Sequence, residues 1–237
     1  MLLINCDMGE GLDNDEALMP FIDAANIACG YHAGNIETIK KTIALAQENK
    51  VQIGAHVSYA DKENFGRKEM FLSSAAVYEM VCEQLRLFSN TAKEMGQVVS
   101  HVKPHGALYN QAARDMELAT TIASAVFDQI PNVVFFGLSS SVMIQAAKSM
   151  GLSTAHEVFA DRAYLNDGSL CPRIIEGAVF TDEASLAAQV SLILQEKKIK
   201  TMDGVEIDVA ADTICIHADT PNAFAFAKTI YRLVKNK

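Results

Sequence analysis

The sequence predicts an α/β fold in one domain, residues 1–237, and three observations support this fold class. The chain of 237 residues is 50% hydrophobic, which is enough to bury one sizeable core. Short apolar runs rich in Val and Ile alternate with longer segments of helical spacing, a pattern typical of parallel sheets with right-handed crossovers. Seven strand–helix units can be counted, which favours a barrel over an open sheet, although periodicity alone does not separate the two.

Seven apolar runs of four to six residues are the predicted strands, because buried strands commonly have this length. In chain order they cover residues 2–6, 25–29, 51–55, 98–102, 133–137, roughly 154–159, and 213–216. We find no linker, low-complexity tract or internal repeat between them, which supports a single domain.

The segments between the strands carry helix end signals. Asn35 and Ser74 are predicted N-caps, Asp182 begins a further helix, and Gly96 lies just past a predicted C-terminus. The other predicted helices cover residues 15–22, residues 141–150 and a segment that begins at Thr220-Pro221. Residues 160–177 lack periodicity and are predicted to form a long loop over the site.

Charge and cysteine content argue against several classes of protein. The formal net charge of −9 repels phosphate backbones and anionic lipids, so neither nucleic acid nor a membrane surface is an expected partner. Five cysteines without a CxxC pair indicate reduced thiols and a cytoplasmic location. No stretch approaches the ~20 apolar residues of a membrane span, and the first seven residues lack the basic start of a signal peptide.

Polar side chains gather where the predicted strands end. In parallel α/β folds, active sites are assembled on the rim that the carboxyl ends of the strands form. The polar residues at these ends are Asn5, Asp7, Glu10, Asn26, His32, His56, His101, Lys103, His105, Glu157, Asp161, Arg162, His217 and Asp219. Each alone has a structural explanation, such as a helix cap or an ion pair, but their gathering at one end of the sheet favours a site.

The segment from His101 to His105 carries the densest group of these side chains. Residues i and i+2 of a strand share a face, so His101, Lys103 and His105 are predicted to form one row. Pro104 argues against a helical metal motif here, because proline disrupts a helix interior. A row with a lysine at its centre suits an anionic or phosphorylated intermediate at least as well as a metal.

Seven sequence blocks together resemble the LamB/YcsF family, and they occur in the family's order over nearly the whole chain. They are NCDMGEG at 5–11, ANIACGYHAG at 25–34, IGAH at 53–56, NFGR at 64–67, HVKPHGALYN at 101–110, EVFADR at 157–162 with Tyr164, and IHADT at 216–220. The glycine segments at 29–35 and 64–67 match neither the P-loop nor the dinucleotide fingerprint, so any nucleotide would need a different binding mode.

The resemblance implies a seven-stranded parallel β/α barrel of the glycoside hydrolase/deacetylase type, which agrees with the seven units counted above. It implies a hydrolase role as the A subunit of an ATP-dependent 5-oxoprolinase, which opens 5-oxo-L-proline to L-glutamate as ATP is hydrolysed. ATP with Mg²⁺ is then the expected co-substrate, and no organic cofactor is expected. Subunits B and C are the expected partners, and a homo-oligomer is compatible with the sequence.

The resemblance and the chemistry of the side chains together suggest roles at the site. The expected catalytic residues are Asp7, His56, Lys103, His105, Asp161 and Arg162. The expected substrate-binding residues are Asn5, Glu10, Asn26, His32, Arg67, His101, Tyr109, Asn110 and His217. Lys103 and Arg162 would meet developing negative charge or phosphate. His105 or His56 would be the general base, oriented by one of the two catalytic aspartates.

Three positions depart from the family's pattern. Leu3 stands where the family usually has Asp, Val57 replaces a proline that often follows the GAH histidine, and Ala218 replaces a glycine in the closing motif. Strand alternation places position 3 on the inward face with Asn5. The Leu3 departure therefore removes an expected inward carboxylate that could transfer protons or bind a metal.

Two alternative functions stay open at this point. Asp7, His56 and His105 could supply the ligands of a stand-alone metal-dependent deacetylase or amidohydrolase, with a position left for an activated water. The chain could also be a non-catalytic subunit that binds 5-oxoproline or its partners.

Overall fold

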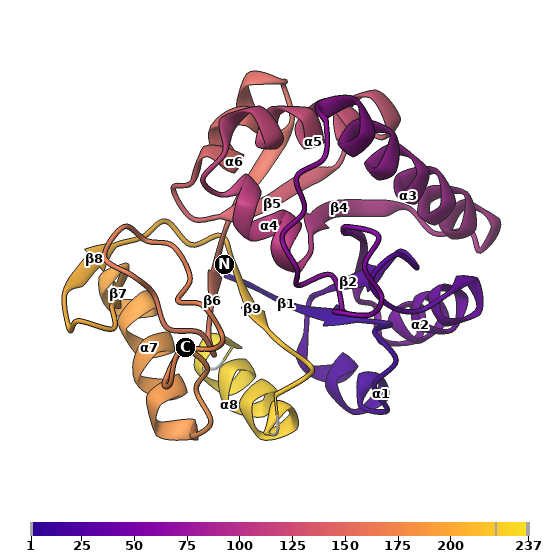
Figure 1. The fold of residues 1–237 in the computed structure, drawn as a ribbon. Coiled ribbons are helices and arrows are strands. Elements are labelled where there is room, and N and C mark those ends of the chain that lie inside the picture. Colours follow the sequence, from indigo (N-terminus) through magenta and orange to yellow (C-terminus); the bar gives the residue numbers. More distant parts are fainter. Residues whose placement is uncertain (1, 221, 236–237) are drawn as a thin grey trace.

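The first and last long strands of the sheet are neighbours, and their pairing closes the sheet into a barrel (Figure 1). This computed structural model describes residues 2–220 and 222–235. The barrel consists, in order around it, of β1 (Leu3–Met8), β2 (Ala24–Ala28), β3 (Gln52–Val57), β4 (Val99–Pro104), β5 (Val134–Leu138), β6 (Ser153–Phe159) and β9 (Thr213–Ile216). All neighbouring pairs are parallel, which confirms the predicted seven-stranded parallel β/α barrel.

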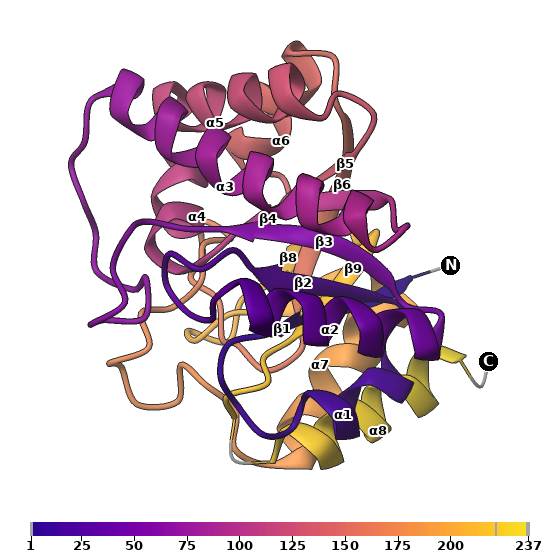
Figure 2. The same cartoon turned by 90° about the vertical axis from the view of Figure 1, so that its right-hand side faces the viewer.

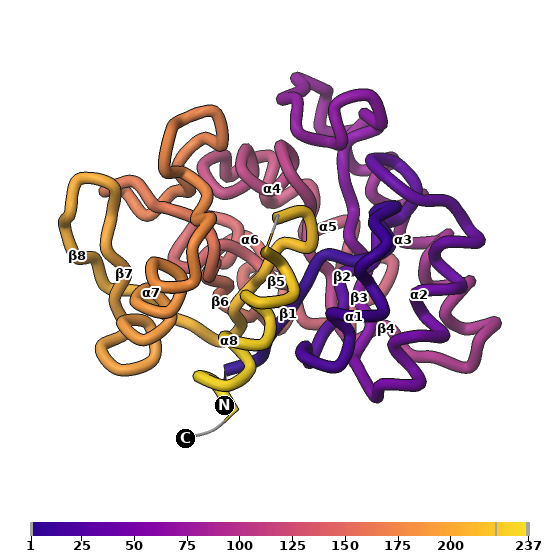
Figure 3. Tube along the Cα trace, turned by 90° about the horizontal axis from the view of Figure 1, so that it is seen from below, coloured from indigo at the N-terminus to yellow at the C-terminus, as the bar shows by residue number. Residues whose placement is uncertain are grey.

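Helices flank the outside of the barrel (Figure 2). Each of them contributes buried apolar side chains to the main core. They are α1 (Asp15–Leu18) with the 3-10 turn η1 (Met19–Phe21), α2 (Ile36–Asn49), α3 (Ser74–Glu94), α4 (Gly106–Ala112), α5 (Met116–Gln129), α6 (Val142–Ser149), α7 (Glu183–Glu196) and α8 (Ala223–Lys235). In α2, for example, Ile39, Ile43 and Ala46 are fully buried, as expected for a stripe of period 3.6. The first and last helices, α1 and α8, lie side by side (Figures 2 and 3).

The predicted strands all form, with ends that differ by at most two residues from the expected ones. Asn35 and Asp182 are confirmed as N-caps, because their side chains accept hydrogen bonds from the backbone N–H of Thr38 and Ser185. The predicted cap at Ser74 is wrong by one residue. The hydroxyl of Ser73 accepts from the Ala76 N–H, so α3 already includes Ser74.

Four elements were not predicted. Helices α4 and α5 both lie between β4 and β5, and α5 begins at an Asp115 cap whose carboxylate accepts from Leu118 N–H. An antiparallel pair of short strands, β7 (Lys198–Lys200) and β8 (Glu206–Asp208), precedes β9. Strands of three residues are too short to show a period. Part of the predicted helix start at Thr220-Pro221 lies outside the described residues.

The register of the strands places inward-facing polar residues at one level of the barrel. Asp7 is paired with Asn26, Asn26 with Gly54, and Gly54 with His101 in the neighbouring strand. Toward the amino-terminal ends of the strands the interior is apolar, and it contains Ala24, Phe136 and Ala155. Polar residues therefore occupy the carboxyl-terminal half of the barrel interior, where the strands end.

Along the described part of the chain, no helix has the length and apolarity that crossing a membrane requires. All five cysteines are buried free thiols.

Candidate active site

A cavity of about 470 Å³ opens at the carboxyl ends of the barrel strands. The loop of residues 160–182 contributes Leu170 to Ile174 to its wall, which confirms the predicted loop over the site. The cavity is lined by these residues expected from the sequence: Asp7, His56, Arg67, Lys103, His105, Tyr109, Asn110, Arg162 and His217. Its volume falls in the range of small-molecule sites.

Lys103 is buried at the centre of the site, with only 2% of its surface exposed. Its Nζ lies 2.9 Å from Asp7 Oδ1, 2.9 Å from Glu157 Oε1 and 3.0 Å from Cys215 Sγ. Burial lowers the pKa of Lys103, but Asp7, Cys215 and Glu157 outweigh burial and raise that pKa well above its usual value. Lys103 is therefore a fixed cation and cannot act as a base near neutral pH.

Asp7 connects this lysine to a group of histidines. Its Oδ1 also accepts a hydrogen bond of 2.8 Å from Asn26 Nδ2, and its Oδ2 lies 3.2 Å from His56 Nε2. Burial raises the pKa of Asp7, but His56 and Lys103 outweigh it and hold the pKa well below the usual range. Asp7 is therefore an ionised carboxylate at neutral pH.

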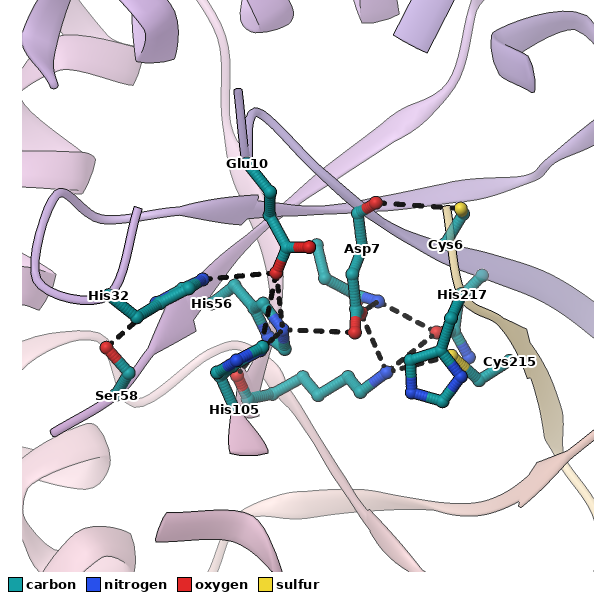
Figure 4. Close-up of polar contacts among 12 residues, drawn as sticks. Cys6, Asp7, Glu10, His32, His56, Ser58, His105, Cys215 and His217 are labelled. Carbon is teal, nitrogen blue, oxygen red and sulfur yellow. Dashed lines mark hydrogen bonds and ion pairs between the residues drawn. The ribbon is translucent and has the colours of Figure 1, made fainter. Parts of the chain in front are cut away.

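Three histidines surround the carboxyl group of Glu10 (Figure 4). Glu10 Oε1 lies 3.1 Å from His32 Nε2, 3.3 Å from His105 Nδ1 and 3.9 Å from His56 Nε2. Burial, with the nearby Asp7, raises the pKa of Glu10 well above its usual value. Burial is also the main cause that lowers the pKa of His32 and His105. Burial therefore favours the neutral rings of His32 and His105. The ligand atoms of Glu10, His32, His56 and His105 lie close enough to share a cation.

Asp161 and His217 form a second acid–histidine pair. His217 Nδ1 lies 3.0 and 3.1 Å from the two carboxylate oxygens of fully buried Asp161, so Nδ1–H donates to them. Among the described residues, Nε2 of His217 has no hydrogen-bond partner, and His217 lines the cavity while Asp161 lies behind it. This arrangement leaves one imidazole nitrogen available to a molecule in the cavity.

Arg162 lines the cavity without a carboxylate partner. Its guanidinium donates to the backbone carbonyls of Cys171 at 2.6 Å and Ala178 at 3.3 Å. Within residues 2–220 and 222–235, no carboxylate oxygen lies within 4.0 Å of it. Burial, together with Arg173, lowers its pKa to about 10, so it stays charged at neutral pH. By contrast, Arg67 pairs with Asp219, which lies outside the cavity wall.

Five of the residues expected to bind substrate lie beneath or beside the cavity and do not line it. They are Asn5, Glu10, Asn26, His32 and His101. Asn26 Nδ2 donates to both Asn5 and Asp7, and its Oδ1 lies 2.8 Å from His101 Nε2. These contacts show that the residues beneath the cavity hold Asp7 and Lys103 in place. Leu3 also does not line the cavity, because it lies at the amino end of β1 beside Thr213.

Two partners of Lys103 were given no catalytic or substrate-binding role from the sequence, although Glu157 was among the polar residues expected at the strand ends. Glu157 is fully buried, and among the described residues neither of its oxygens has a hydrogen bond of normal geometry despite the nearby ammonium. Strand alternation could have identified Cys215, since it lies two residues before His217 in or near the same strand. The carbonyl of Phe65, which contacts His105 Nε2 at 2.9 Å, carries no signal in the sequence.

Comparisons with known proteins cover essentially the whole chain. The sequence model of the LamB/YcsF family matches residues 2–237. The A subunit of 5-oxoprolinase from Shouchella clausii (strain KSM-K16) is 46% identical over 232 residues, which are 96% of this chain and 92% of that protein. The crystal structure of the lactam utilization protein from Thermus thermophilus superposes with a TM-score of 0.92 at 37% identity, covering 99% of this chain and 96% of that one.

Proposed function

This chain belongs to the LamB/YcsF family, and from this we propose that it is the A subunit of an ATP-dependent 5-oxoprolinase. The proposed reaction converts 5-oxo-L-proline, ATP and two water molecules into L-glutamate, ADP and phosphate, with subunits B and C as partners. A five-membered lactam is a resonance-stabilised amide that resists water. Phosphorylation of its oxygen would make the ring carbon electrophilic, which explains why ATP is required.

The observation that carries the proposal is the buried guanidinium of Arg162, which lines a cavity of about 470 Å³ and has no carboxylate partner among the described residues. Because a buried cation needs a partner, Arg162 supports binding of an anion. The substrate carries a carboxylate, and the activated intermediate would carry a phosphate. Lys103, held by Asp7 and Glu157, adds fixed positive charge at the base of the same cavity.

His217 is the general base that the geometry favours. Its Nδ1–H is held by Asp161, so Nε2 presents a lone pair to the cavity, and an orienting carboxylate behind a base is the usual arrangement. His217 would take a proton from the attacking water and return it to the ring nitrogen as the C–N bond breaks. In His56 and His105, by contrast, one ring nitrogen contacts a backbone carbonyl and the other faces the second histidine at 2.9 Å.

The test is the reconstituted complex of all three subunits, with glutamate formation and phosphate release measured together. His217→Gln is expected to lower glutamate formation by about 10²–10⁴-fold, the usual contribution of a general base. Omission of ATP is expected to abolish it. His156→Gln is the matched control, because His156 is half-buried on β6 and does not line the cavity. Near-normal ring opening by a folded His217→Gln complex would refute the assignment.

A further inference from the structure

Two buried histidines in the cluster around Glu10 point ring nitrogens at each other. His56 Nδ1 lies 2.9 Å from the backbone carbonyl of Lys103, and His105 Nε2 lies 2.9 Å from that of Phe65. A carbonyl oxygen can only accept, so both of these outer nitrogens carry the proton. In the neutral rings, the inner nitrogens, His56 Nε2 and His105 Nδ1, are then both bare, and they lie only 2.9 Å apart. Two lone pairs at this distance require a cation between or beside them.

The same point is surrounded by carboxylate oxygens. Glu10 Oε1 is 3.3 Å from His105 Nδ1 and 3.9 Å from His56 Nε2, and Asp7 Oδ2 is 3.2 Å from His56 Nε2. A tetrahedral zinc ion with bonds of about 2.0–2.1 Å separates its ligand atoms by about 3.3 Å. The separations of 2.9–3.9 Å between these donor atoms lie around the edge length of a tetrahedral site.

His32 contacts Glu10 but is not placed as a ligand. Its ring is stacked on that of His105, with centroids 3.9 Å apart and an angle of 6° between the planes. A metal in the plane of one ring cannot lie in the plane of the other. The rings of His56 and His105 are nearly perpendicular at 86°, which allows both to bind one ion. His32 Nε2 instead supports Glu10 from outside, as partners of ligating carboxylates do.

The backbone that orients His105 is strained. Phe65 has φ +55°, a left-handed conformation that is unfavourable for a residue other than glycine. Gly66 follows with φ +65°, and a side chain there would come within 3.0 Å of His32 and His105. The loop of residues 61–67 is thus packed tightly against the rings and aims a carbonyl at His105. Such an outer contact sets the tautomer of metal-binding histidines.

We propose that Glu10, His56 and His105 form a binding site for one divalent transition-metal ion of the zinc type, with Asp7 or a molecule in the cavity as the fourth ligand. Nitrogen and carboxylate donors in a tetrahedral arrangement suit zinc. Asp7, His56 and His105 line the cavity, so the ion would face it. The metal-site proposal can be tested separately from the proposed reaction, because metal binding is measured without turnover.

The full chain, freed of metal with a chelator, is titrated with Zn²⁺ by calorimetry and with Co²⁺ by visible absorption. One equivalent is expected to bind, with the intense absorption of tetrahedral cobalt. His105→Gln is expected to weaken zinc binding by more than about 100-fold, and the outer His32→Gln by about 10–100-fold. His156→Gln, away from the cluster, should bind as the wild type does. Absence of stoichiometric binding, or unchanged affinity in a folded His105→Gln chain, overturns the site.

A second measurement separates a metal from a shared proton. Nitrogen-15 spectra of the histidine side chains report which ring nitrogens are protonated. With one equivalent of zinc, His56 should carry a proton only on Nδ1 and His105 only on Nε2, as their carbonyl contacts require. An imidazolium on either ring under these conditions would show that a proton takes the place of the metal.

Discussion

Single buried residues at this site have protonation states set by their surroundings. His101 is 1% exposed, its ring is stacked on Phe136 with centroids 4.4 Å apart, and its two nitrogens contact Ser100 and Asn26. Burial, with the charge of Lys103, lowers the pKa of His101 to about 3. At neutral pH this histidine is therefore a neutral hydrogen-bonding group that holds Asn26, and through it Asp7.

This shift predicts that His101 makes the protein less stable in acid. In the unfolded chain it takes up a proton near pH 6.5, whereas in the folded chain it stays neutral to about pH 3. Between these two pH values the unfolded state binds more protons than the folded state. The contribution of His101 to the free energy of unfolding is therefore fully present above pH 6.5 and is lost as the pH falls. From pH 7.5 to pH 5 this loss is about 2 kcal/mol.

Denaturant unfolding at the two pH values checks this prediction. His101→Gln should lose about 2 kcal/mol less than the wild type between pH 7.5 and pH 5. Equal losses in both proteins would show that His101 does not titrate differently in the folded chain.

Strand β3 makes room for the ring of His101. The register between β3 and β4 shifts between Ile53 and Gly54, and Gly54 lies directly beside His101. A Cβ atom on Gly54 would lie 2.2 Å from the His101 ring. Because Gly54 has no side chain, the ring of His101 on the neighbouring strand fits inside the barrel.

Gly54→Ala is expected to destabilise the protein by about 1–3 kcal/mol or more, because the imidazole must move within a packed barrel. Gly137→Ala on β5 is the matched control. A Cβ there meets Met143 and Ile144 at 3.1 and 3.2 Å, contacts that small shifts can relieve. The denaturation midpoints of both variants are compared with that of the wild type. A cost for Gly54→Ala no greater than that for Gly137→Ala would contradict this account.

At the scale of the whole molecule, the barrel depends on contacts between the two ends of the chain. Strand β1 pairs with β9 from Leu3↔Thr213 to Cys6↔Ile216, and Lys235 of α8 forms an ion pair of 2.8 Å with Asp23. One hydrophobic cluster includes side chains from every barrel strand and from the helices around it. The main core of the described residues is therefore shared by all seven strands of the barrel.

We therefore expect one cooperative unfolding transition. Far-ultraviolet circular dichroism follows the helices, and near-ultraviolet circular dichroism follows the buried tyrosines Tyr59, Tyr109 and Tyr164. Both signals should change at the same denaturant concentration. Two separate transitions would indicate that the chain contains independently stable parts.

The sequence by itself determined the seven strands, their parallel arrangement and the end of the barrel where the polar residues gather. Apolar runs and alternation are local properties, so they can be read without knowledge of distant contacts. The row of His101, Lys103 and His105 was predicted in this way, and all three side chains face the interior of the barrel.

Only the tertiary structure decided which of these groups contact each other. Asp161 pairs with His217, 56 residues away in the sequence, and its neighbour Arg162 binds backbone carbonyls of the covering loop. The tautomer of His105 depends on the carbonyl of Phe65, 40 residues away. Such contacts depend on barrel closure and on loop backbone angles. Neither leaves a periodic pattern in the sequence, because the groups that meet come from separate strands and loops.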